Sequence, residues 1–106
     1  MSHFDNLMAI VTANNDTYAR ITHDLHLFED LDATSEAKRQ ETKRNHFAHE
    51  YANALDNYVI RNYDELKPSD FRVFDLVPYL VWNKISIKAS HIAAKIEEVH
   101  KGQKPV

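Results

Sequence analysis

The stretch that decides the fold is residues 2–31, SHFDNLMAIVTANNDTYARITHDLHLFEDL. Its apolar side chains recur at steps of three and four residues, the spacing of one face of an α-helix. They are Phe4, Leu7, Met8, Val11, Tyr18, Ile21, Leu25 and Phe28. Ser2 is a suitable N-cap. Glu29, Asp30 and Asp32 are unfavourable within the last turns of a helix, so we expect the helix to stop at these residues. A helix is therefore predicted over about 2–31. Asn14, Asn15 and Asp16 are poor helix formers, and we expect them to kink or split it.

The following segment, about 34–66, combines a charged half with an apolar half. Thr34 or Ser35 can cap a helix there. The residues from Ala33 to Asn45 are strongly charged, and an apolar stripe begins only at Phe47. The charged half is therefore expected to be either a solvated helix that projects from the body or an arm that faces a partner.

Prolines mark the remaining breaks in the chain. Lys67-Pro68-Ser69-Asp70 ends the second helix, and Pro78 must kink or restart the third. Helices are predicted over about 69–77 and 78–101. The last of these has an apolar stripe on one face and a basic stripe, Lys84, Lys88, His91 and Lys95, on the other.

Turn-forming residues are scarce. The 106 residues include one glycine, Gly102, three prolines and no cysteine. Sandwiches, barrels and glycine-rich phosphate loops need many glycines, so an all-α fold is predicted. The length suits a single domain, 1–106, built as an antiparallel bundle of three to four long helices. One tryptophan, five tyrosines and five phenylalanines are many for so small a core, so we expect homodimerisation to complete the bundle.

The overall charge is modest, at −3 with seven neutral histidines, so composition alone does not indicate a nucleic-acid-binding protein. Without cysteine the chain has neither disulfides nor thiolate metal sites, which is compatible with a reducing compartment. We expect a cytoplasmic protein with no signal peptide, no membrane span and no cofactor.

The densest group of reactive side chains is KRNHFAHEY, residues 43–51. Within it, Arg44, Asn45, His49 and Tyr51 follow an Arg-x4-His-x-Tyr pattern. This pattern resembles the motif of HEPN-domain proteins, small all-helical dimers that include metal-independent ribonuclease toxins and their inactive relatives. The apolar pair Phe47-Ala48 before the histidine is also typical of that family.

The resemblance implies that two copies of the motif face one another across a dimer and form one RNA-cleaving cleft. In it, His49 would act as acid or base and Arg44 would hold the phosphate, with Asn45 and Tyr51 in support. These residue types suit the chemistry, because histidine titrates near neutral pH and the arginine fork matches a phosphate. The alternative is that Arg44 and His49 are ordinary surface residues, and that Phe47 and Tyr51 belong to the core.

Two other groups of residues could be binding sites or ordinary surface residues. A weak metal alternative comprises His23, His26, His46, His49 and Glu50, because histidines and carboxylates one turn apart can share a metal. The basic stripe of residues 84–95 could bind an RNA backbone or simply face solvent.

The two leading functions are thus a HEPN-like ribonuclease of toxin–antitoxin or phage-defence type, with RNA as substrate, and a non-catalytic helical interaction protein. The latter would be an immunity, antitoxin or phage-regulatory protein that uses its dimer surface to bind a protein partner.

Overall fold

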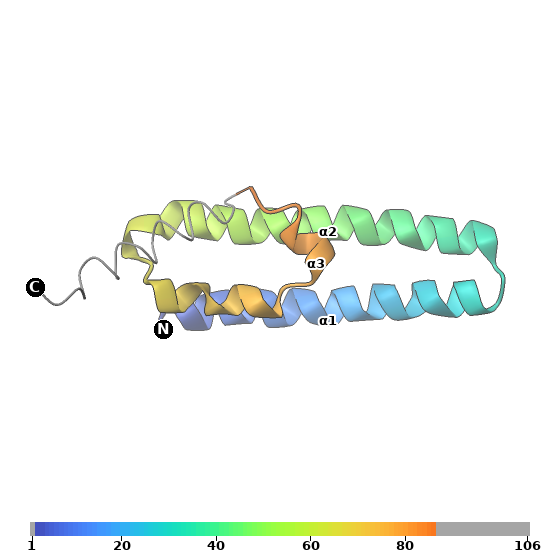
Figure 1. Ribbon diagram of the computed structural model, residues 1–106, viewed down its shortest axis with the longest axis horizontal. Helices are drawn as coiled ribbons and strands as arrows, with labels where there is room; N and C mark the ends of the chain where they lie inside the picture. The colour runs from blue at the N-terminus through green and yellow to red at the C-terminus, as the bar shows by residue number, and fades with distance from the viewer. Residues whose placement is uncertain (1, 87–106) are drawn as a thin grey trace, which may run out of the picture.

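A computed structural model of the chain describes residues 2–86, and these residues are helical with no strand among them. In chain order the elements are α1 (His3–Asp30), α2 (Thr34–Asn62), the 3₁₀ helices η1 (Tyr63–Glu65) and η2 (Pro68–Leu76), and α3 (Tyr79–Trp82). The long helices α1 and α2 lie side by side and run in opposite directions (Figure 1). The segment η2 packs against α1, and α3 packs against α2. The predicted all-α class is confirmed.

Helix α1 begins at its expected cap and continues without a break. Ser2 Oγ accepts a hydrogen bond from the backbone N–H of Asp5 at 3.1 Å. Helix α1 is continuous through residues 14–16, where a kink or a split was predicted, and both asparagine side chains there are held by hydrogen bonds. Asn14 Nδ2 donates to the carbonyl of Ile10 at 2.8 Å, one turn back. Asn15 points toward the core and bonds to other elements.

The turn between α1 and α2 forms without glycine. Asp32 adopts a φ of 55°, in the left-handed region, which aspartate tolerates better than most residues. The N–H of Ala33 then donates to the carbonyl of Phe28 at 2.9 Å and closes the C-terminus of α1. The acidic residues at the C-terminal end of α1 therefore lie beside the N-terminus of α2. The partial positive charge of that N-terminus offsets some of the repulsion between these carboxylates and the negative end of the α1 dipole.

Helix α2 ends earlier than predicted. It stops at Asn62 rather than near residue 66, and the chain tightens into η1 before the break at Pro68. The predicted helix over 69–77 is present as the 3₁₀ helix η2. In a 3₁₀ helix, residues three apart eclipse one another. That geometry stacks Phe71 on Phe74, with ring centroids 5.9 Å apart, and turns both rings into the core.

The predicted helix over 78–101 is interrupted close to its start. Helix α3 ends at Trp82, and the chain turns through residues 83–86. The buried carboxylate of Asp56 accepts the backbone N–H of Ser86 at 2.8 Å, which holds this turn against α2. The rest of the predicted helix, from residue 87 onward, lies outside the described residues.

The main hydrophobic core occupies one half of the α1–α2 pair, whereas Ile21 and Leu25 are buried separately in the other half. The main core combines the first half of α1, the second half of α2, η2 and α3, with Leu7, Val11, Tyr51, Leu55, Val59, Val73 and Val81 almost completely buried. The remaining half of the pair, residues 16–46, extends past η2 and α3 and is called the arm below (Figure 1). With a rise of 1.5 Å per residue, each helix of the arm extends about 20 Å beyond Asn15.

The aromatic side chains are mostly covered within one chain. Tyr51, Phe71 and Phe74 are buried, and Tyr18, Phe47, Tyr58, Tyr63 and Trp82 pack half-buried against the core. Among the aromatic residues, only Phe4 and Tyr79 are exposed, and Tyr79 is 79% accessible. The number of aromatic residues therefore does not by itself require a second copy.

Replacing Leu55, which is completely buried between the elements of the core, with alanine should lower the free energy of unfolding by about 2–5 kcal/mol. The matched control is Leu31→Ala, since Leu31 is 67% exposed in the turn and should change stability by less than about 0.5 kcal/mol. Urea denaturation followed by circular dichroism measures both. Equal effects of the two substitutions would contradict the placement of the core.

Candidate functional site

Tyr51, the tyrosine of the HEPN-like motif, is a core residue. Its side chain is completely buried, and its hydroxyl donates to Asn15 Oδ1 at 2.8 Å, with the carbonyl of Val11 3.4 Å away. Burial raises the pKa of the Tyr51 phenol well above its ordinary value of 10.0. The hydroxyl is thus committed to α1 and is shielded from any phosphate bound at the surface of this chain.

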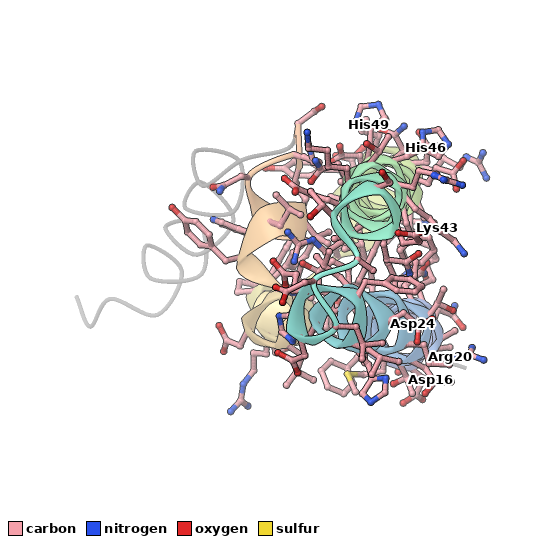
Figure 2. The ribbon with its side chains drawn as sticks, turned by 90° about the vertical axis from the view of Figure 1, so that its right-hand side faces the viewer. Asp16, Arg20, Asp24, Lys43, His46 and His49 are labelled. Carbon is pink, nitrogen blue, oxygen red and sulfur yellow. The ribbon has the colours of Figure 1, made fainter. Side chains whose placement is uncertain are left out.

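The other three motif residues lie on different sides of α2. Asn45 and His49 are exposed and one turn apart, so they share an outward face. Figure 2 shows His49 directed outward from α2. Arg44 is half-buried against the α1 side, and its Nε is buried with no hydrogen-bond partner among residues 2–86. Five residues of ideal helix separate Arg44 and His49 by about 140°. One chain alone does not bring the arginine, histidine and tyrosine together.

The histidines of the metal alternative are spread over exposed surfaces. His46 Nε2 lies 3.1 Å from Glu50 Oε1, one turn along α2, and His23 Nδ1 lies 3.6 Å from its neighbour Asp24 on α1. His26 and His49 are also exposed. Within residues 2–86, no three histidine, aspartate or glutamate side chains are grouped so that they could hold a metal ion.

The basic stripe can be placed at one position only. Lys84 lies half-buried in the turn after α3. Lys88, His91 and Lys95 lie outside the described residues, so the stripe remains a prediction.

The arm carries opposite charges on its two helices. On α1 and the turn, acidic residues dominate, with Asp16, Asp24, Glu29, Asp30 and Asp32 against Arg20. On α2, basic residues dominate, with Lys38, Arg39, Lys43 and Arg44 against Glu36 and Glu41. Figure 2 shows Arg20 and Lys43 on the side turned away from η2 and α3. A recess of about 250 Å³ lies at the tip, where Leu25, Phe28 and Ala37 line it together with polar and charged residues, namely Glu29, Asp32, Thr34, Lys38 and Glu41.

A polar cluster that the sequence patterns do not reveal lies at the opposite end of the molecule. There His3 of α1 contacts both Tyr58 of α2 and Glu65 of η1, and Asn6 also reaches Tyr58. The partners are separated by more than 50 residues along the chain, so no local motif could have indicated the cluster.

Comparison with protein-family models, curated proteins and solved structures returns no match for this chain. Functional inference therefore depends on the geometry of the chain itself.

Neither α1 nor α2, nor any shorter helix within residues 2–86, combines the length and the apolar character needed to span a bilayer.

Replacing Tyr51 with phenylalanine should cost about 1–2 kcal/mol of unfolding free energy near neutral pH, because Asn15 Oδ1 loses its buried donor. The unfolded tyrosine ionises above its ordinary pKa of 10.0, whereas the folded one stays protonated to higher pH. Wild-type stability should therefore be retained below pH 10.0 and fall above it, by up to about 1.4 kcal/mol per pH unit from this group.

Urea denaturation of wild type and Tyr51→Phe at pH 8 and pH 11 tests this linkage, and the advantage of the wild type should shrink at the higher pH. The control is Tyr79→Phe at an exposed position, which should resemble wild type near neutral pH. A wild-type advantage that is constant between the two pH values would contradict the buried, protonated state of Tyr51.

Proposed function

We propose that this chain is a non-catalytic helical interaction protein, of the kind found among immunity, antitoxin and phage-regulatory proteins, and that it acts through its arm as a homodimer. The observation that carries the proposal is the arm itself. Among residues 2–86, η2 and α3 cover the other half of the α1–α2 pair and leave the arm projecting. Within the arm only Ile21 and Leu25 are buried. This largely polar two-helix projection adds little to the main core, so its use in binding explains its presence better than folding does.

The charges of the arm suit a second copy of the same chain. A two-fold axis parallel to the helices would place α1 of one protomer beside α2 of its partner. Acidic α1 would then meet basic α2 twice in the same interface, as an isologous contact requires. The four helices would form the bundle completed by homodimerisation that is predicted from the sequence. The recess at the tip would remain available to a further protein partner.

The local chemistry of the tip supports a binding role. Acidic residues at the C-terminal end of α1 oppose the helix dipole, and no basic residue occurs in its last turn. Leu27 and Leu31 are also exposed there, at 46% and 67%. Residues that lower the local stability of a helix, such as these acidic ones, are characteristic of surfaces that contact other molecules.

Reversing one charge of the arm should weaken this dimer. In Lys43→Glu, two symmetric attractive contacts become repulsive, so the dissociation constant should rise at least about fivefold. Added salt should weaken the wild-type dimer and have a smaller effect on the variant. Sedimentation velocity over a range of concentrations measures both effects.

The matched control is Arg72→Glu, an exposed basic residue of η2 outside the arm, which should leave the dissociation constant unchanged. The double variant Lys43→Glu with Asp24→Lys should recover part of the affinity. A single-chain mass for the wild type at every concentration would remove the proposed dimer.

A metal-independent HEPN-like ribonuclease is the second candidate. It is supported by the exposed pair Asn45 and His49, next to the partly accessible Arg44. The same two-fold pairing could supply the arginine from one protomer and the histidine from the other, which a single chain does not achieve. Tyr51 has no role in contacting RNA in this version, because it is buried.

Purified wild type, His49→Ala and the control His46→Ala, all incubated with RNA in EDTA, distinguish this candidate. Both histidines are exposed on α2, but only His49 matches the motif. Loss of cleavage by about 100-fold or more in His49→Ala alone would support the ribonuclease. Absence of cleavage by the wild type, or equal loss in both variants, would exclude it.

A further inference from the structure

Three elements meet around His3 at the end of the molecule opposite the arm. His3 Nδ1 lies 2.7 Å from the hydroxyl of Tyr58 on α2, and His3 Nε2 lies 2.9 Å from Glu65 Oε2 on η1. Asn6 Nδ2 donates to the same tyrosine hydroxyl at 3.0 Å. The imidazole and phenol rings meet edge to face, with centroids 5.8 Å apart.

The donors and acceptors of this cluster match if His3 is neutral with its proton on Nε2. That proton is donated to the Glu65 carboxylate, which accepts only, and the free lone pair on Nδ1 accepts the Tyr58 hydroxyl. The amide of Asn6 approaches the phenol oxygen from another side and steadies it. Glu65 thereby selects the tautomer that presents a base to Tyr58.

This is the arrangement of an activated nucleophile. A hydroxyl is hydrogen-bonded to a base, and the base is oriented by a third group, as in a Ser-His-Asp triad. The cluster lies at the surface, because the His3 side chain is 27% exposed, the Glu65 side chain is 72% exposed and Tyr58 is half-buried. The structural alternative is a polar clamp that only fastens the start of α1 to the end of α2.

We infer that Tyr58 is an acyl-acceptor site, with His3 as its base and Glu65 as a positioning residue, and that its co-substrates are uncharged activated esters, whose leaving groups are at least as acidic as a phenol. The phenol oxygen attacks the ester carbonyl while its proton passes to His3 Nδ1. The bond from the acyl carbon to the leaving oxygen then breaks, the leaving oxygen takes the proton back from His3 Nδ1 and departs as a neutral hydroxyl compound, and the tyrosyl ester remains. The carboxylates of Glu65 and nearby Asp64 repel phosphate donors, which favours uncharged acyl groups.

p-Nitrophenyl acetate is a suitable probe, because each acylation releases a coloured p-nitrophenolate, and peptide mass spectrometry locates the acetyl group. Tyr79 is an internal control in the same molecule, since its residue is 79% exposed and it belongs to α3, which lies near the middle of the molecule and away from the N-terminal end that carries His3 (Figure 1). In the wild type, Tyr58 should be acetylated at least about tenfold faster than Tyr79, although Tyr58 is less accessible. This comparison requires no variant and no correction for folding.

Variants then separate the proposed base from a merely structural clamp. His3→Ala should reduce the Tyr58-to-Tyr79 acetylation ratio at least about tenfold, and Glu65→Ala should reduce it less, because His3 keeps its contact with Tyr58. Circular dichroism verifies that each variant is folded. Acetylation of Tyr58 no faster than Tyr79 in the wild type, or an unchanged ratio in folded His3→Ala, would overturn the inference and leave the cluster as a clamp.

Discussion

The side chain of Asn15 on α1 connects this helix to α2 and to η2. Its Oδ1 accepts the buried hydroxyl of Tyr51 on α2 at 2.8 Å, and its Nδ2 donates to the carbonyl of Leu76 at the end of η2 at 2.9 Å. One amide thus fixes the register of α1 against α2 and the position of η2 on α1. The core lies on one side of this point along the helices, and the arm begins on the other.

The hydrogen bond between Asn15 and Tyr51 decides which residues of the HEPN-like motif remain accessible at the surface. Tyr51 is needed to complete the bond to Asn15, so the motif that resembles HEPN proteins is divided between the core and the surface. Arg44 and His49 face different directions on α2, and only a second protomer could combine them over one phosphate. The dimer proposed for the arm would supply such a pairing, because the two helices of the arm carry opposite charges. The interaction protein and the ribonuclease thus depend on the same dimer but differ in whether His49 reacts.

The two ends of the molecule are chemically independent. The arm is a charged, projecting surface of helices α1 and α2, whereas the His3 cluster joins α1, α2 and η1 at the opposite end. A failure of dimerisation would leave the geometry around Tyr58 unchanged. Likewise, an inert Tyr58 would not affect the pairing of the arms. The two proposals can therefore be judged separately, although both rely on the antiparallel packing of α1 and α2.

The sequence by itself determined the helical class, the N-cap of α1, the break at Pro68 and part of the core, because these depend on local spacing and on the scarcity of glycine. It did not determine the start of α2, whose cap is Ala33 rather than the predicted Thr34 or Ser35. Ser2, Pro68 and the apolar stripe of α1 act over a few residues, so their effects can be read from the chain. Only the tertiary structure decided that Asn15 would bond to Tyr51 and Leu76 instead of kinking α1, that residues 68–76 would form a 3₁₀ helix, and that α3 would end at Trp82. It also placed Tyr51 inside and assembled His3, Tyr58 and Glu65. Contacts between segments more than 50 residues apart depend on how the helices pack, and no local pattern encodes that packing.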